Sequence, residues 1–217
     1  MSDETRRDPL HSPEAEAAAL SDALAYLDAY REGTLQFDED RLDIRFVDDP
    51  ATGRLVATVP VAALLASHVV LFVPEEGMDV MQLLVTLEEA PESAATDRWM
   101  IYHGEPEHVR WATMWIDSAR LGVWVFDGEA LTVPNPLGDD QARLCRHVNE
   151  REELLRGACR RERDLDVDAP RCVGVDPRGL HVRGRFGVIR LPFPSEALEA
   201  TEALRRIDDL LTVPEQG

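Results

Sequence analysis

The sequence predicts an α+β fold, in which an antiparallel β-barrel follows one N-terminal helix and precedes a small α-β-β-β-α domain. Hydrophobic residues recur with a period of two between residues 42 and 126, in short segments joined by turns, as in antiparallel sheets. A helical period precedes this stretch and returns after it. Two prolines and a glycine within Val133–Gly138 mark a boundary. We therefore predict a disordered tail at 1–12, a barrel domain at 13–137 and a C-terminal domain at 138–217.

The first helix is indicated by its start and by its spacing. Ser12 is a favoured N-cap residue, Pro13 suits the first helical position, and Glu14 complements the positive end of the helix dipole. Gly33 is the predicted terminator of this helix. The apolar positions at helical spacing are Ala17, Leu20, Leu24 and Leu27.

The barrel is predicted to contain about seven strands with short connections, which favours an antiparallel meander. Before the tryptophans, the segments with strand character are 42–46, 54–59, 68–73 and 80–87. The predicted connections are a turn at Asp48–Gly53, one helical turn at Val61–Ala66, a turn at Pro74–Gly77 and a loop at Glu88–Thr96.

All four tryptophans lie between Trp99 and Trp124. We interpret this stretch as three strands, one on each side of the turn Gly104–Glu107 and a third that ends at Asp127. Side chains of the second strand alternate between two largely apolar faces, so we expect this strand to be covered on both sides. The two faces carry Trp111, Thr113 and Trp115 on one side and Ala112, Met114 and Ile116 on the other.

The C-terminal segment combines helical and strand patterns. Helical spacing predicts one helix that extends to about Arg163, and Ser195 is a predicted N-cap of a last helix. Between them, three short strands are predicted at 172–175, 180–185 and 188–193. The positions with helical spacing in the first helix are Leu144, Val148, Leu155 and Cys159.

Composition excludes several classes of function. The 217 residues carry a net charge of −19, and all 23 basic residues are arginines. Such an acidic surface repels phosphate backbones and anionic lipids, so we expect neither nucleic-acid nor membrane binding. The absence of lysine excludes Schiff-base chemistry and the P-loop lysine. Because the N-terminus has no apolar signal core, we expect a cytoplasmic protein.

The three cysteines, Cys145, Cys159 and Cys172, contain no CxxC pair. Cys145 and Cys159 fit one face of a helix, but a rise of ~1.5 Å per residue places them ~21 Å apart. A disulfide needs Cα atoms within ~7 Å, so these two cannot form one. We expect buried, reduced thiols.

Three motifs in the C-terminal third resemble one family. Arg146–Glu152 resembles the "His-Met-Asn-x-Asp-His" helix start of the small α/β domain in haem-utilisation proteins of the HugZ type, and Val175–Leu180 resembles its "Val-Asp-x-x-Gly-hydrophobic" hairpin. Ile189–Pro194 resembles its closing "Arg-hydrophobic-x-Phe" strand. The match covers roughly 140–212. Residues 14–137 resemble the preceding pyridoxamine-phosphate-oxidase-like split barrel in architecture alone.

The resemblance implies FMN or haem as a cofactor. From the first motif His147 and Asn149 are retained, and they are candidate cofactor-binding residues. Arg151 and Glu152 stand where the family has Asp and a second His, and a carboxylate is a poorer iron ligand than an imidazole. His147 is a candidate metal or haem ligand, with helix capping or packing as the alternative.

Other candidate site residues come from the tryptophan region. Arg98 and Arg110 are candidates for binding an anionic cofactor through forked donors, although pairing with Asp or Glu is the alternative. Trp111 is a candidate for stacking on a planar ligand, with a core or a dimer interface as the alternative. His103 and His108, beside two glutamates, are candidate metal ligands, and a polar hairpin tip is the alternative.

Three functional interpretations remain open. The favoured one is a non-catalytic member of the haem-utilisation-like group that acts as a binding or interaction module. A small planar anionic ligand is a candidate partner. The alternatives are a flavin- or haem-binding oxidoreductase and a purely structural homodimer. No Gly-x-Ser-x-Gly, His-Glu-x-x-His or Gly-x-Gly-x-x-Gly motif occurs, so the sequence assigns no catalytic residue and leaves open whether the protein is an enzyme. We also expect a homodimer through apolar contacts, favoured at high ionic strength because screening reduces the repulsion between acidic chains.

Overall fold

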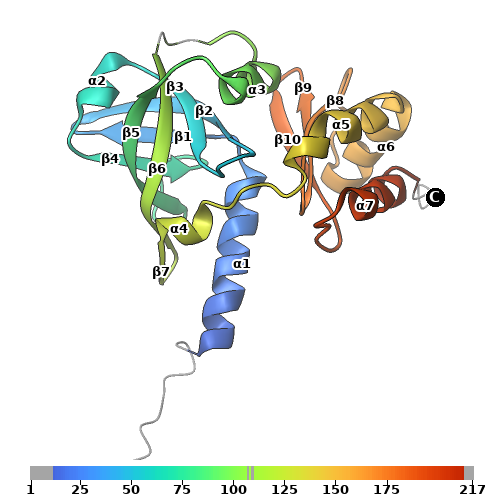
Figure 1. The fold of residues 1–217 in the computed structure, drawn as a ribbon, viewed down its shortest axis with the longest axis horizontal. Helices are drawn as coiled ribbons and strands as arrows, with labels where there is room; N and C mark the ends of the chain where they lie inside the picture. Colours follow the sequence, from blue (N-terminus) through green and yellow to red (C-terminus); the bar gives the residue numbers. More distant parts are fainter. Residues whose placement is uncertain (1–11, 107, 109, 213–217) are drawn as a thin grey trace, which may run out of the picture.

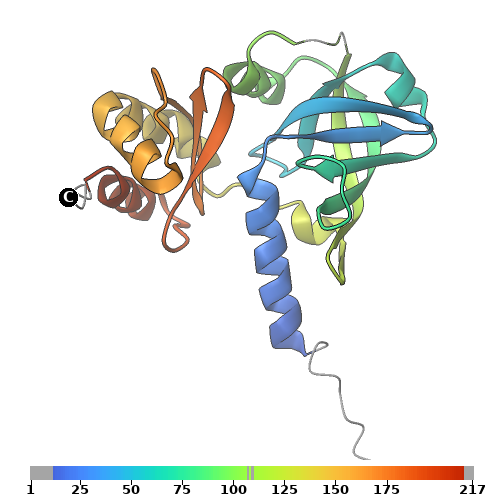
Figure 2. The ribbon, with the colours of Figure 1, turned by 180° about the vertical axis from the view of Figure 1, so that it is seen from behind.

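The computed structural model describes residues 12–106, 108 and 110–212, and the predicted tail before Ser12 lies outside this range. Figure 1 shows a barrel on one side, a small sheet covered by helices on the other, and helix α1 (Pro13–Ala29) reaching their junction. Figure 2 shows the same arrangement from behind, with α1 projecting away from both parts. Within the described part of the chain, no helix has the length and apolarity needed to cross a membrane.

The larger sheet is an antiparallel barrel with one extra strand. Its order is β3-β2-β1-β4-β5-β6-β7, and an additional β3–β6 pairing closes it. The predicted α+β class and antiparallel barrel are therefore confirmed. A short helix, α2 (Val61–Leu65), follows β3 as expected. The strands are β1 (Glu32–Phe37), β2 (Asp40–Asp48), β3 (Leu55–Val59), β4 (Val69–Val73), β5 (Met81–Ala90), β6 (Arg110–Leu121) and β7 (Trp124–Asp127).

Strand β6 shows which face is the core. Ala112, Met114 and Ile116 are buried inside the barrel with the inward residues of the other strands. On the other face, Trp115 is 38% exposed, and the Arg54 guanidinium lies 3.3 Å from its ring centroid. The expectation that both faces are covered is therefore wrong at this end of the strand, because an arginine and solvent, rather than a second layer, contact the outer tryptophan.

Helix α1 begins as predicted, since the Ser12 hydroxyl accepts a hydrogen bond from Ala15 N at 3.1 Å. It ends at Ala29, before Gly33, which instead lies in β1 and pairs with Ile44. A Cβ at this glycine would lie 2.4 Å from Phe72 O, so the close approach of β1 and β4 requires glycine. The prediction missed β1 because its apolar pattern is short.

The first tryptophan segment is a helix, α3 (Ala94–His103), and not the predicted strand. A capping box starts it, in which the Ser93 N–H donates to Thr96 Oγ1 at 2.8 Å. Trp99 and Tyr102, three residues apart, are buried on one helix face. The predicted 88–96 loop is correspondingly shorter, because β5 continues to Ala90. A short apolar run does not distinguish helix from strand by periodicity.

The C-terminal part is a three-stranded antiparallel sheet, order β10-β9-β8, with its own hydrophobic core against helices. The predicted single helix is two helices, because Arg151 leaves the helical conformation. Ser195 is not a helix cap, since the last helix begins at Ala200. The elements are η2 (Gly138–Asp140), α5 (Gln141–Asn149), α6 (Glu152–Arg163), β8 (Arg171–Asp176), β9 (Gly179–Gly184), β10 (Gly187–Pro192) and α7 (Ala200–Thr212). The short helix α4 (Gly128–Leu131) precedes them and follows the last barrel strand in the chain.

Charged residues are buried where the two parts meet. Arg190 donates to both oxygens of Asp176 at 2.6 Å each, and Arg178 Nη2 lies 2.7 Å from Asp28 Oδ2 on α1. Arg31 Nη2 lies 3.0 Å from Asp48 Oδ1. Asp176 and Arg190 are the residues of the second and third resembling motifs, so in this chain they hold the sheet and connect it to α1.

Helix α3 also joins the two parts. Tyr102 packs against β8 at Gly174, where a Cβ would lie 1.7 Å from the phenol oxygen. Trp99 and Tyr102 share an apolar cluster with Val173 and barrel residues. Glycine is therefore required at this position of β8. Because α3 contacts both parts, the division into separate domains at residue 138 stays a prediction.

Candidate functional site

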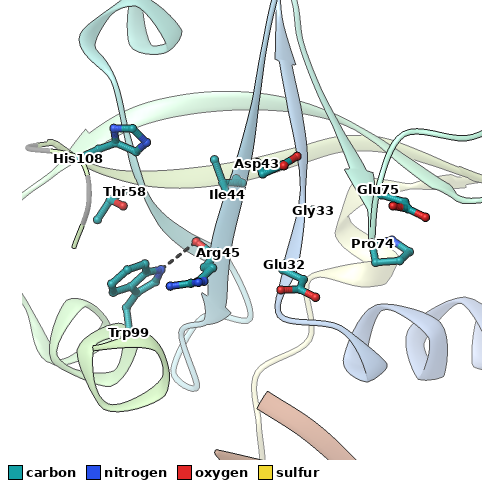
Figure 3. Close-up of a pocket in the computed structure, with 10 residues that line it drawn as sticks. All are labelled: Glu32, Gly33, Asp43, Ile44, Arg45, Thr58, Pro74, Glu75, Trp99 and His108. Carbon is teal, nitrogen blue, oxygen red and sulfur yellow. Dashed lines mark hydrogen bonds between the residues drawn. The ribbon is translucent and has the colours of Figure 1, made fainter. Parts of the chain in front are cut away.

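One pocket lies on the barrel beside α3 and has acidic character (Figure 3). Its volume is 350 Å³. Three carboxylates, Glu32, Asp43 and Glu75, line it together with Arg45 and one histidine. Because carboxylates outnumber cationic groups, this pocket disfavours an anionic cofactor. Its lining residues are Glu32, Gly33, Asp43, Ile44, Arg45, Thr58, Pro74, Glu75, Trp99 and His108.

A second pocket, which we call the arginine pocket, lies at the β8 edge of the small sheet, between α3 and α5. Its volume is 530 Å³, within the usual range of about 300–1,000 Å³ for small-molecule sites. The described residues that line it include three arginines and no aspartate, glutamate or histidine. They are Arg98, Ile101, Gln141, Ala142, Cys145, Asn149, Arg171, Cys172, Val173 and Arg183.

Two of these arginines are neighbours on adjacent strands of the small sheet. Arg171 and Arg183 are direct partners in the β8–β9 register, so their side chains share one face. Arg183 donates to the Ile101 carbonyl at 2.6 Å, and neither arginine forms an ion pair with a carboxylate of the described chain. Like charges placed directly opposite on a sheet are destabilising. The pair is therefore an unneutralised positive site in a protein with net charge −19.

The third arginine is held from the barrel side. Arg98 Nη2 donates to the Tyr102 hydroxyl at 2.7 Å and lies 3.6 Å from Asp48 Oδ2, while Nη1 donates to Gln141 Oε1. Arg98 Nε and Gln141 Nε2 are buried with no hydrogen-bond partner in the described structure. Unsatisfied buried donors cost about 1–3 kcal/mol each.

Asn149, predicted from the resemblance, lines this pocket but its amide is already in use. Its Nδ2 donates to Cys172 O at 2.9 Å, and its Oδ1 accepts from Cys172 N at 2.8 Å. The side chain therefore satisfies the backbone at the open edge of β8 as a neighbouring strand would. In this chain Asn149 positions the pocket wall.

His147 lies outside the arginine pocket. Its Nε2 is 2.8 Å from Asp208 Oδ1 on α7, and Arg151 donates to the same oxygen. Burial opposes ionisation of Asp208, but the hydrogen bonds from Arg151 and His147 lower its pKa. The imidazole thus joins α5 to α7, and a role for His147 in binding a cofactor stays a prediction.

Arg110 and Trp111 also lie outside the lining of the arginine pocket. Arg110 Nη1 lies 3.1 Å from Glu89 Oε1 at the surface, which is the carboxylate pairing considered as the alternative. The Trp111 ring meets Trp99 edge to face, with centroids 5.5 Å apart. The arginine pocket therefore brings together Arg98 and Asn149 of the predicted cofactor residues, whereas Arg110, Trp111 and His147 lie outside its lining.

The two candidate metal ligands have different surroundings. His103 Nε2 is 3.1 Å from the Phe46 carbonyl, and burial lowers the pKa of His103 to about 4. His108 lines the acidic pocket (Figure 3). In the described ranges, no group of three histidine, cysteine or acidic side chains has a geometry suited to a metal ion. Metal binding by His103 and His108 stays a prediction.

Sequence reasoning missed Arg171, Arg183 and Gln141. A signal was present, because the short connection between the predicted strands at 172–175 and 180–185 places residues near 171 and 183 opposite each other in a hairpin. The approach of α3 and α5 to that hairpin joins segments more than forty residues apart, as the contact between Arg98 and Gln141 shows.

Comparison with known proteins supports the fold. A protein of unknown function from Agrobacterium tumefaciens is similar in structure over 94% of this chain and 99% of its own, with a TM-score of 0.66 and 12% identity. A heme-binding protein from Mycobacterium smegmatis aligns over 89% of this chain and 96% of its own, with a TM-score of 0.41 and 16% identity. No protein-family model and no curated protein matches the sequence. The first likeness extends over both parts of the chain and shows a shared fold alone.

Proposed function

We propose that this protein is a binding module for a small ligand with a phosphate or carboxylate group, and that the arginine pocket receives that group. The observation that carries the proposal is the cross-strand pair of Arg171 and Arg183, which faces the pocket without a carboxylate partner. Other exposed arginines of the chain have such partners, as Arg110 does in Glu89 and Arg143 does in Asp140. An anion would replace the repulsion between the two guanidinium groups with charge-assisted hydrogen bonds.

The remaining lining supports binding of a partly apolar molecule. Arg98 and Gln141 add polar groups from α3 and α5, while Ile101 and Val173 offer apolar contact. The described lining holds no histidine or carboxylate that would act as a general acid or base. This favours a binding role over acid–base catalysis at the arginine pocket.

FMN and haem are the ligands that the family resemblance implies, and each combines anionic groups with a planar ring. The arginines fit the phosphate of FMN or a haem propionate. For haem iron, the candidate ligand atoms in the lining are the Cys145 and Cys172 sulfurs. A flavin- or haem-dependent oxidoreductase is the alternative function, and it requires one of these groups to bind and to change redox state.

Isothermal titration with FMN, haemin and pyrophosphate tests the proposal. We expect saturable binding of at least one probe, and Arg171→Gln should weaken it about 10-fold or more, since a hydrogen bond to a charged group contributes about 1.5–3 kcal/mol. Arg205→Gln on α7 is the matched control, because it removes the same charge from an exposed position outside the pocket. Equal affinity of Arg171→Gln and Arg205→Gln would overturn the proposal.

We also propose the homodimer that the sequence suggests, on different grounds. Trp99 is 2% exposed, so its side chain is unsuited to an interface. The last strand of the larger sheet, β7, offers a better surface. Val123, just before this strand, is 84% exposed, and Val125, within it, is 69% exposed. Such an apolar strand edge is suited to pairing with another chain. Light scattering should give twice the monomer mass at high salt, and a 24.3 kDa species at both low and high salt would contradict the dimer.

A further inference from the structure

The wall of the arginine pocket contains two cysteines in contact. Cys145 on α5 and Cys172 on β8 have sulfur atoms 3.8 Å apart, with the Cys172 thiol donating to the Cys145 sulfur. They are 27 residues apart in the chain. The third cysteine, Cys159, is buried elsewhere in the C-terminal core and does not line the pocket. The protein therefore has one thiol pair and one separate thiol.

The backbone on each side of the pair is fixed. Asn149 lies one helical turn after Cys145 on the same face of α5. Its amide makes hydrogen bonds of 2.9 and 2.8 Å with the carbonyl and N–H of Cys172. These two bonds hold the helix and the strand that carry the sulfurs at a constant separation.

The two thiols differ in access and in charge environment. Cys145 is partly exposed, whereas Cys172 is 2% exposed. The hydrogen bond from Cys172 lowers the pKa of Cys145, burial opposes this, and the Arg98 guanidinium adds to the lowering. The interaction with Cys145 and burial raise the pKa of Cys172. Cys145 is thus the thiol that reacts first, and Cys172 is placed to react with the product.

We propose that Cys145 and Cys172 form an oxidisable dithiol that reduces hydroperoxides entering the arginine pocket. The inference goes beyond ligand binding and does not depend on it. The positive charge of the arginines that line the pocket favours the thiolate form of Cys145. The adjacent Cys172 converts the first oxidation product into a disulfide.

The chemistry balances in two steps. The Cys145 thiolate attacks a peroxide oxygen, so an S–O bond forms, the O–O bond breaks, and the leaving alkoxide takes a proton from water to give an alcohol. Cys172 sulfur then attacks the Cys145 sulfenic acid, losing its proton. The S–S bond forms, the S–O bond breaks, and water leaves. Two thiols lose two electrons and two protons, and the hydroperoxide becomes an alcohol and water.

The reaction needs only a short movement. The sulfur atoms must close from 3.8 Å to ~2.05 Å, the length of a disulfide bond. Cys159 provides an internal comparison, because burial raises its pKa to about 11. At pH 8, its thiolate fraction is about 100-fold below that of a thiol with a pKa of 9 or less.

The test treats the full chain with tert-butyl hydroperoxide at pH 8 and counts thiols after unfolding. We expect the count to fall from three to one, dithiothreitol to restore it, and peptide mapping to find Cys145 joined to Cys172. The Cys159→Ala variant should fall from two thiols to none. In Cys172→Ala, dimedone should trap a sulfenic acid at Cys145. In the wild-type chain, Cys145 should be oxidised faster than Cys159, because a larger fraction of it is thiolate.

Two results would overturn the dithiol. One is a Cys145 that reacts no faster than Cys159 in the folded chain. The other is oxidation that joins Cys145 of two chains while Cys172 stays reduced. The Cys159→Ala variant keeps the test decisive if a substitution at the pair impairs folding, because it retains both reacting thiols.

Discussion

Two pairs of arginines in the small sheet and its first turn differ in their partners. At the junction with α1, Arg190 and Arg178 lie against Asp176 and Asp28 at distances of 2.6 and 2.7 Å. At the β8 edge, Arg171 and Arg183 face each other with no carboxylate partner in the described structure. The first pair holds the two parts of the protein together, and the second is available to a ligand.

In an acidic chain, the presence or absence of a carboxylate partner separates structural arginines from candidate binding residues. A buried arginine that is paired with a carboxylate has a structural role, and removal of the carboxylate leaves the buried positive charge uncompensated. An arginine pair without such a partner costs stability in the free protein, and we propose that an anion binds there and neutralises it. Arg98 on α3 combines the two properties, because it lies near Asp48 and also lines the pocket.

The largest expected effect comes from breaking a paired arginine. Asp176→Ala should destabilise the protein by about 3–5 kcal/mol, because Arg190 is left buried without its partner. Glu196→Ala is the matched control, since it removes the half-exposed partner of Arg178 and should cost about 0–1 kcal/mol. Urea unfolding of both variants measures the difference. Equal midpoints would show that the buried pair is not what holds the junction.

Stability should also fall in mild acid, and the buried histidines set the sign. Burial lowers the pKa of His181 well below the ordinary value of 6.5, and it lowers that of His103 to about 4. The unfolded chain therefore binds protons near pH 6.5 while the folded chain does not. Each histidine should reduce stability by up to about 1.4 kcal/mol per pH unit as the pH falls below 6.5.

A second acid-dependent loss follows at lower pH. Burial raises the pKa of Asp176, but Arg190 outweighs it and holds the pKa below 3.8, so this stabilisation is present above 3.8 and is lost below it. Urea midpoints between pH 8 and pH 3 resolve both ranges. His103→Gln should reduce the slope between pH 6.5 and 4. A midpoint that stays constant from pH 8 to pH 5 would contradict the neutral buried histidines.

Occupation of the unpaired arginines should protect the neighbouring thiol. Pyrophosphate at ten times its dissociation constant should slow the reaction of Cys145 with hydroperoxide about 10-fold, because the free fraction of the pocket reacts. Chloride at equal ionic strength is the control for screening. If pyrophosphate binds the wild-type chain yet leaves the rate unchanged, the bound anion and Cys145 do not share one pocket.

The smallest effect concerns the free protein. Relative to Arg205→Gln, Arg171→Gln should raise stability by about 0.2–1 kcal/mol, because it relieves the like-charge contact with Arg183. Both substitutions change the net charge equally, so thermal unfolding without added ligand compares them directly. Lower stability of Arg171→Gln than of the control would mean that the guanidinium has a stabilising partner.

Sequence patterns predicted the fold better than the site. Strands of the C-terminal hairpins are apolar runs bounded by turn residues, so local chemistry was sufficient to locate them. Helix α3 was mispredicted because Trp99–Tyr102 is a short apolar run, and its start depends on the Ser93 and Thr96 capping box. Such a local signal is present in the sequence but is easily outweighed by aromatic residues that favour strands.

The site depends on contacts that no local pattern contains. Arg98 was predicted to bind an anion, and its side chain lines the arginine pocket. Gln141 and Cys172 line the same pocket from elements that are distant in the sequence. His147 and Asn149 were singled out by resemblance, and their hydrogen bonds to Asp208 and Cys172 give them positioning roles in this chain. Residue type alone does not separate a ligand-binding side chain from one that joins two elements.

A crystal of the full chain soaked in tungstate shows whether Arg171 and Arg183 bind an anion. Anomalous scattering locates the tungsten without assumptions about the ligand. We expect a peak in the arginine pocket with tungstate oxygens within ~3 Å of both guanidinium groups. The peak should be lost in Arg171→Gln and retained in Arg205→Gln. Tungstate bound elsewhere with the arginine pocket empty would show that this arginine pair is not an anion site.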